Sequence, residues 1–144
     1  MKYGIFTKPI HVEKLANHLN QHPDIDYIIS TSKEEIYAYD FDIGISYCFP
    51  YIVDVNSKPW YNYHPAPLPK YPGLMNYAQP IHDKVKEFGV TLHRMTMEVD
   101  KGEIIATKLF PLPSIPCSTN ELGNIAHYYL FQLFKETIEG LGET

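Results

Sequence analysis

The stretch "DIGISYCF", residues 42–49, is the one on which the fold depends. It is rich in β-branched and aromatic side chains, which are typical of strands. It is also apolar enough to be buried on both faces, as a strand in the middle of a parallel sheet must be. The stretch therefore predicts a central strand of an α/β fold.

Two further strands and a helix are predicted upstream of it. The segments "KYGIFT" (2–7) and "DYIIS" (26–30) are short β-rich runs. Between them, residues 11–22 place Val12, Leu15, Ala16 and Leu19 on one helical face, and Pro23 ends the helix. Strand, helix and strand in this order favour a Rossmann-like, mostly parallel sheet with flanking helices and right-handed crossovers.

The elements downstream are predicted from the same periodicities. Residues 32–40 form a weak helical turn or loop, and residues 73–88 look helical in parts, with Pro80 marking a distortion or a restart. Residues 89–95 alternate as in a strand, with Val90 and Leu92 on one face and Thr91 and His93 on the other. A strand over 103–112 and a helix from about Ser118 to Leu141 complete the chain. We expect residues 1–144 to form one domain.

Composition restricts the class of partner. The chain has 144 residues, of which 44% are hydrophobic, and a formal net charge of −5, with its 12 basic residues scattered singly. This is unlike the basic stripe of a nucleic-acid-binding protein, so a small-molecule substrate is favoured. No apolar run is long enough to span a membrane and the start resembles no secretory signal, which predicts a cytoplasmic protein. The histidines show no spacing typical of metal ligands, so no metal is expected.

Three polar side chains are the candidate catalytic groups. Asn62 and His64 open the proline-rich segment "YNYHPAPLPKYPG" (61–73), and their i, i+2 spacing points both side chains the same way in extended backbone. An amide and an imidazole aimed at one point can stabilise a developing oxyanion. Asp100 lies in a loop just before Gly102. A carboxylate there would raise the pKa of the His64 imidazole, or pass a proton through a water molecule.

Each of these residues also has an ordinary structural interpretation. Asn62 is compatible with a turn, His64 with an imidazole satisfied by a backbone carbonyl, and Asp100 with a loop cap. The prolines at 65, 67, 69 and 72 stiffen the segment whichever interpretation holds. The three residues alone do not decide between catalysis and structure.

Three stretches taken together resemble the folate-dependent formyltransferases, which include glycinamide ribonucleotide, methionyl-tRNA and sugar N-formyltransferases. That family has Asn-x-His before a loop reading L-P-x-x-x-G, then a strand reading G-[VCI]-T-[VIL]-H, and then an Asp before x-G. The stretches are "YNYHPAPLPKYPG", "GVTLHRM" and "EVDKGEII", and the resemblance covers about residues 41–112. The matching residues are Asn62, His64, Leu68, Pro69, Gly73, Gly89, Val90, Thr91, Leu92, His93, Asp100 and Gly102.

The resemblance implies transfer of a formyl group from N10-formyltetrahydrofolate, as co-substrate, to a primary amine, with no metal. Asn62 and a protonated His64 would stabilise the oxyanion, and Asp100 would hold His64 and help take the amine proton. Thr91 and His93 would support these groups. The residues implied for binding the pterin, chiefly through backbone groups, are Tyr47, Cys48, Phe49, Tyr51, Ile52, Val99, Lys101 and Gly102.

The chain also departs from the family pattern. The turn "FTKPIH" (6–11) has Pro9 and Ile10 where a glycinamide ribonucleotide enzyme would carry a glycine-rich phosphate cradle. Asn62 comes earlier in the chain than is usual in the family, so we expect a shortened core. We also expect no RNA-binding domain of the kind that methionyl-tRNA formyltransferases carry. A nucleotide-linked amino sugar is the expected acceptor, and a homodimer is allowed. Two alternatives stay open: a formyltetrahydrofolate hydrolase and a folate-binding module without turnover.

Overall fold

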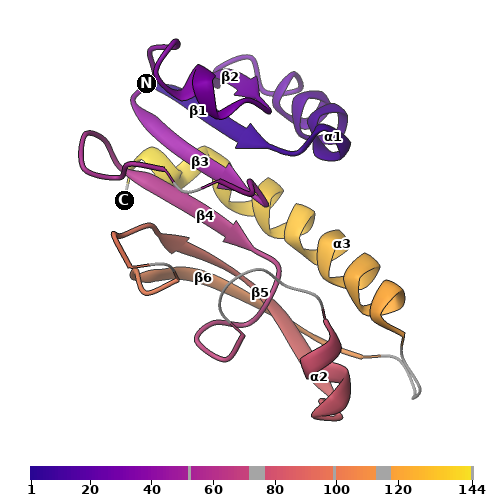
Figure 1. Cartoon of the computed structure of the whole chain (residues 1–144). Helices are drawn as coiled ribbons and strands as arrows, with labels where there is room; N and C mark the ends of the chain where they lie inside the picture. The colour runs from indigo at the N-terminus through magenta and orange to yellow at the C-terminus, as the bar shows by residue number, and fades with distance from the viewer. Residues whose placement is uncertain (52, 72–76, 99, 113–117, 144) are drawn as a thin grey trace.

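The computed structural model describes residues 1–51, 53–71, 77–98, 100–112 and 118–143 (Figure 1). Its elements, in chain order, are β1 (Lys2–Thr7), α1 (Pro9–Leu19), β2 (Asp26–Ser30), the 3-10 turn η1 (Lys33–Ile36), β3 (Ile43–Tyr47), β4 (Trp60–His64), α2 (Ala78–His82), β5 (Glu87–Arg94), β6 (Ile104–Pro111), α3 (Thr119–Thr137) and the 3-10 segment η2 (Ile138–Glu143).

The six strands form one mixed sheet in the order β2-β1-β3-β4-β5-β6. The first four strands are parallel, whereas β4–β5 and β5–β6 are antiparallel. The predicted mostly parallel α/β sheet is therefore confirmed. Because β1 has β2 on one side and β3 on the other, the strand order reverses between β1 and β3. Open sheets of this kind bind ligands outside the carboxyl ends of the strands at such a point.

Helices cover one face of the sheet. The strands turn alternate side chains toward α1 and α3, and in β3 these are Ile43, Ile45 and Tyr47. Figure 1 shows α3 running along this face, and the ring of His18 in α1 lies 6.1 Å from that of Phe134 in α3. We call this side the helix face.

The other side of the sheet, which we call the open face, carries a smaller aromatic cluster around Phe6, Phe41 and Trp60, with η1 over it. Every residue of β3 is buried, as residues 42–49 predict. Trp60 begins β4 on the open face, so the polar residues further along β4 lie on this side as well. The candidate catalytic residues Asn62 and His64 are thus separated from the helix core by the sheet itself.

Three boundaries differ from the sequence-based expectation. The first helix begins at Pro9, a position whose missing N–H is not needed in a first turn, and it ends at Leu19. Pro80 lies inside the short helix α2 for the same reason, at its third residue. Residues 60–64, for which the sequence predicts no strand, form the strand β4 with a partner on each side.

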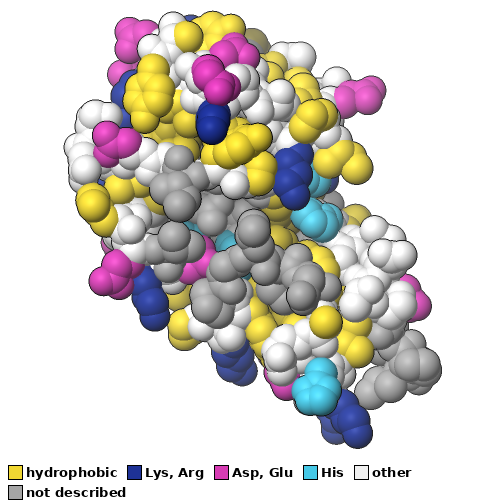
Figure 2. Space-filling view, in the orientation of Figure 1, with side chains coloured by type: hydrophobic (Ala, Val, Ile, Leu, Met, Phe, Trp, Pro, Cys, Tyr) yellow, Lys and Arg dark blue, Asp and Glu magenta, His cyan; other side chains and the backbone are white. Residues whose placement is uncertain are grey.

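Among the residues that the structure describes, no helix combines the length and apolarity that a membrane crossing requires. Lysine and arginine side chains are dispersed over the face seen in Figure 2 and do not gather into a stripe. On this face, the basic side chains are scattered singly, as they are in the sequence.

Candidate active site

Strand pairing gathers four polar side chains on the open face. Asn62 and His64 alternate along β4 with the core residue Tyr63, so both point away from the helices. The antiparallel register sets His93 of β5 opposite Asn62, and Thr91 opposite His64. Asn62 and His64 thus point the same way, as predicted, and His93 and Thr91 of β5 lie beside them.

Asn62 is oriented by His93. The amide nitrogen of Asn62 lies 3.2 Å from Nε2 of His93. Nδ1 of His93 lies 3.0 Å from the backbone carbonyl of Arg94, which can only accept a hydrogen bond. In the neutral imidazole the proton is therefore on Nδ1, and Nε2 accepts a hydrogen from Asn62. The amide group carries a second N–H, which can be donated to an oxygen on a ligand.

His64 is held by a backbone carbonyl. It is 5% exposed, and its Nε2–H donates to the carbonyl of Tyr71 at 2.8 Å. In the neutral ring this leaves a lone pair on Nδ1, which faces Asp100 Oδ1 at 4.0 Å. A hydrogen bond to a backbone carbonyl was the structural alternative to a catalytic role for His64. In the structure this hydrogen bond fixes the tautomer of the ring, but it involves Nε2 and not Nδ1.

The pKa of His64 shifts in the direction opposite to the one expected from its carboxylate neighbour. Burial lowers the pKa of His64 below its usual value and outweighs the opposing effects of the Tyr71 carbonyl and the Asp100 carboxylate. His93 lowers the pKa of His64 slightly further. The ring is therefore neutral at neutral pH. Sequence reasoning placed the carboxylate correctly but could not measure how completely the ring is removed from water.

Asp100 reaches the site from the loop after β5. Its side chain is 4% exposed, and its Oδ1 lies 3.5 Å from Nε2 of His93 as well as 4.0 Å from Nδ1 of His64. The backbone at Asp100 has φ 58°, which an aspartate tolerates better than most residues. Gly102 makes this loop possible, because a Cβ there would collide with the carbonyl of Arg94. The three candidate catalytic groups therefore meet, with the carboxylate between two imidazoles.

The residues implied for pterin binding fall into different environments. Tyr47 has its ring in the helix-face core, and its carbonyl already accepts a hydrogen bond from Thr7 Oγ1 at 2.7 Å. Phe49 packs on Phe6 in the open-face cluster. Tyr51 is 45% exposed and offers an aromatic ring for stacking.

The remaining residues of that set lie in and around the loops. Ile52 and Val99 lie outside the described residues, as does Gly73 of the proline-rich segment. Cys48 points toward two histidines of the helix face. Lys101 is exposed, and Gly102 serves the close approach to β5. Tyr51 and Lys101 are thus the exposed members of this set among the described residues.

Thr91 supports the site by anchoring the proline-rich segment. Its hydroxyl donates to the carbonyl of Ala66 at 2.8 Å and accepts from the N–H of Leu68 at 3.1 Å. All three groups are buried. The segment that leaves β4 is thereby tied to β5, which keeps Tyr71 at the distance His64 requires.

Replacing Thr91 with valine keeps the shape of the side chain and leaves two backbone groups without their partner. We expect the free energy of unfolding to fall by about 1–3 kcal/mol, because each buried unsatisfied group costs its desolvation. Urea denaturation of the two proteins measures this difference. Thr91→Ser, which retains the hydroxyl, should recover most of it, and equal stability of wild type and Thr91→Val would contradict the anchoring role.

A hollow of about 410 Å³ also lies on the surface, between η1 and the start of β4. Its lining includes Tyr37, Phe41 and Lys58. It borders the amino ends of the parallel strands, whereas ligands of open sheets bind beyond the carboxyl ends. The polar side chains at the end of β4 are therefore a stronger candidate for the ligand-binding site than this hollow.

Comparison with known proteins identifies the family of this chain. The family model described as "Formyl transferase" matches residues 50–122, slightly more than half of the chain. A phosphoribosylglycinamide formyltransferase of Escherichia coli is 39% identical over 51 residues, which are 35% of this chain and 24% of that protein. A methionyl-tRNA formyltransferase of Borrelia duttonii is 33% identical over 82 residues, 57% of this chain and 25% of that protein. The matches thus span about a quarter of these curated relatives.

The similarity to solved structures extends over nearly the whole chain. An N-formyltransferase from Helicobacter canadensis, in complex with folinic acid and dTDP-3-aminofucose, superposes with a TM-score of 0.81 at 28% identity. The superposition covers 99% of this chain and 64% of the other. The matched region contains Asn62, His64, His93 and Asp100 together. This chain belongs to the formyl transferase family.

Proposed function

We propose that this chain transfers a formyl group from N10-formyltetrahydrofolate to the primary amine of a small substrate. The observation that carries the proposal is the convergence of Asn62, His64 and Asp100 at the carboxyl end of β4. Family membership supports the reaction class. The residues present fit a folate that delivers a formyl group, since they offer an amide donor for its oxygen and an exposed aromatic ring at Tyr51.

Asn62 supplies the fixed hydrogen-bond donor. As the amine attacks, negative charge develops on the formyl oxygen, and a preoriented N–H stabilises it without having to reorganise. His93 keeps the amide in the required orientation by accepting the other hydrogen at 3.2 Å. The donor is thus ready before the reaction begins.

His64 acts as the base in this scheme. The new carbon–nitrogen bond requires the amine to lose one proton, and the folate nitrogen that leaves the formyl carbon must gain one. A neutral His64 can take the amine proton at Nδ1, where Asp100 stabilises the resulting imidazolium from 4.0 Å. This assignment replaces the protonated His64 that the resemblance implied, and protonation becomes a step of the reaction.

The acceptor we propose is an amino sugar carried on a nucleotide. The Helicobacter canadensis protein, whose complex contains dTDP-3-aminofucose, supports this choice at 28% identity over nearly the whole chain. The turn after β1 argues against glycinamide ribonucleotide. Its Lys8 makes no side-chain cap and Pro9 removes one of the N–H groups that a phosphate would use at a helix start.

Incubation of the purified chain with formyltetrahydrofolate and a panel of nucleotide-linked amino sugars tests both parts. We expect mass spectrometry to find one acceptor gaining a formyl group. Glycinamide ribonucleotide, included in the panel, should stay unmodified. Formate released without any amine would instead identify a hydrolase. Folate binding in calorimetry with no formyl consumption would identify a binding module, and either result would overturn the transferase proposal.

A further inference from the structure

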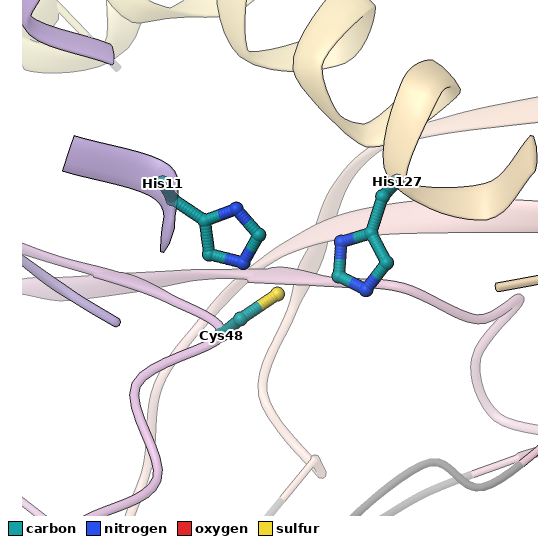
Figure 3. Close-up of side chains that lie close together, drawn as sticks. All are labelled: His11, Cys48 and His127. Carbon is teal, nitrogen blue, oxygen red and sulfur yellow. The ribbon is translucent and has the colours of Figure 1, made fainter. Parts of the chain in front are cut away.

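Two histidines and a cysteine meet on the helix face of the sheet (Figure 3). They are His11 in α1, Cys48 directly after β3, and His127 in α3, and one potential ligand atom from each lies within 4.8 Å of the other two. Figure 3 shows the Cys48 sulfur pointing toward the space between the two imidazoles. The three residues are far apart in the sequence, so no local spacing could predict the cluster. The expectation that the histidines form no ligand set rested on spacing alone.

The cluster occupies the place where open sheets bind ligands. His11 follows β1 and Cys48 follows β3, the two strands between which the strand order reverses. His127 closes the crevice from the helix that covers this face, with its ring 5.3 Å from that of His11. Asn62 and His64 leave the sheet on the open face, so this cluster is distinct from the candidate catalytic groups.

Both histidines of the cluster carry an unpartnered buried nitrogen, as does His18 elsewhere among the described residues. His11 is 7% exposed, and among the described residues Nδ1 of His11 and Nδ1 of His127 are both buried without a hydrogen-bond partner. Buried polar atoms nearly always have a partner, and two imidazoles in contact that both lack one need an explanation.

We propose that His11, Cys48 and His127 form a binding site for a thiophilic metal ion, zinc being the ion that fits best. Two imidazoles and one thiolate are ligands that zinc accepts, with a fourth position left for water or a substrate atom. Bonds of about 2.0–2.3 Å would bring the ligand atoms to about 3.3–3.6 Å from one another. The present spacing, within 4.8 Å, is wider than this, so the proposal requires the three side chains to move closer together when the ion binds.

Cys48 would have to lose its proton in order to bind the ion as a thiolate. Burial raises the pKa of the Cys48 thiol to about 12, although Lys8 and Lys14 work against the shift. Such a thiol is unreactive at neutral pH, but a thiophilic ion displaces its proton directly. Binding therefore forms one metal–sulfur bond and releases one proton to solvent. The positive charges of Lys8 and Lys14 oppose the added cation, so we expect moderate affinity.

Titration of the metal-free chain with Co²⁺, followed by displacement with Zn²⁺, tests the site. We expect one ion per chain, visible bands typical of four-coordinate cobalt, and a near-ultraviolet thiolate-to-cobalt band. The thiolate band should persist in Cys117→Ser, which leaves Cys48 as the only cysteine, and disappear in Cys48→Ser. Calorimetry in two buffers should count one released proton.

Matched variants separate the cluster from adventitious binding. Cys48→Ser and His127→Gln should each weaken binding by more than the roughly 10–100-fold lost when only an outer partner of a ligand is removed. His82→Gln and His22→Gln, which remove imidazoles outside the cluster, should bind as the wild type does. Absence of stoichiometric binding, absence of the thiolate band, or equal loss in the two control variants would each overturn the proposal. The wild-type spectrum decides even if a variant fails to fold, and none of these readouts depends on formyl transfer.

Discussion

Asn62→Ala is expected to lower kcat for formyl transfer roughly 10²–10³-fold, the usual consequence of losing one oxyanion donor. The amide is fixed in advance by its 3.2 Å hydrogen bond to His93. A methyl group in its place offers no hydrogen to the charged oxygen, while water enters without the same orientation. KM should change less than kcat, since the lost interaction is strongest when charge has developed. Steady-state kinetics with the acceptor identified by mass spectrometry measure both constants.

Asn56→Ala is the matched control, because Asn56 is an exposed asparagine away from the polar group at the end of β4. It should retain wild-type kinetics. His93→Ala should cause a smaller loss than Asn62→Ala, as the donor remains but is no longer oriented. If Asn62→Ala stays within a few-fold of the wild type in kcat, the assigned donor is wrong.

The parallel part of the sheet could be predicted because its signal is local. Residues 42–49 are apolar on both faces, and the structure buries all of β3. β4 carries no such signal, since "WYNYH" mixes aromatic and polar residues and proline follows at once. Its strand conformation depends on hydrogen bonding to β3 on one side and β5 on the other. Such partners lie far away in the sequence, so propensity alone could not assign it.

The sequence predicts in which direction the side chains of the candidate site point, but not the protonation state of His64. The period of two places Asn62 and His64 on one face, and it does the same for Thr91 and His93. The protonation state of His64 depends instead on burial by the surrounding segments and on the Tyr71 carbonyl. Both are long-range features, which explains why the sequence indicates which side chains come together but not the direction in which the pKa of His64 shifts.

The cluster of His11, Cys48 and His127 illustrates the same limit. Metal sites are recognised in sequences when the ligands are close together on one turn or helix. Here each ligand comes from a different element, and the reversal of strand order between β1 and β3 brings two of them together. Only the topology of the sheet reveals such a set. The proposed metal site and the proposed formyl-transfer site can therefore be tested separately, one on each face.

His64→Ala is expected to lower kcat/KM about 10²–10⁴-fold, the range that a general base contributes. The pH profile of the wild-type protein shows which protonation state of His64 is active. The neutral ring is the active form, and burial lowers the pKa of His64 below the usual value of about 6.5. Activity should therefore persist at pH 6.5 and decline only as the pH falls through the lowered pKa. His64→Ala should lose this acid limb, and initial rates across pH measure it.

Asp100→Asn provides the second half of this test. The Asp100 carboxylate raises the pKa of His64 against the effect of burial, so its removal should move the acid limb to still lower pH. Turnover should also fall, because the imidazolium formed at Nδ1 loses the charge 4.0 Å away. His82→Ala, at an exposed histidine, should change neither the rate nor the limb. Three results would contradict the assignment of His64 as the base. They are an acid limb above pH 6.5 in the wild type, a shift of that limb to higher pH in Asp100→Asn, and near-normal turnover in His64→Ala.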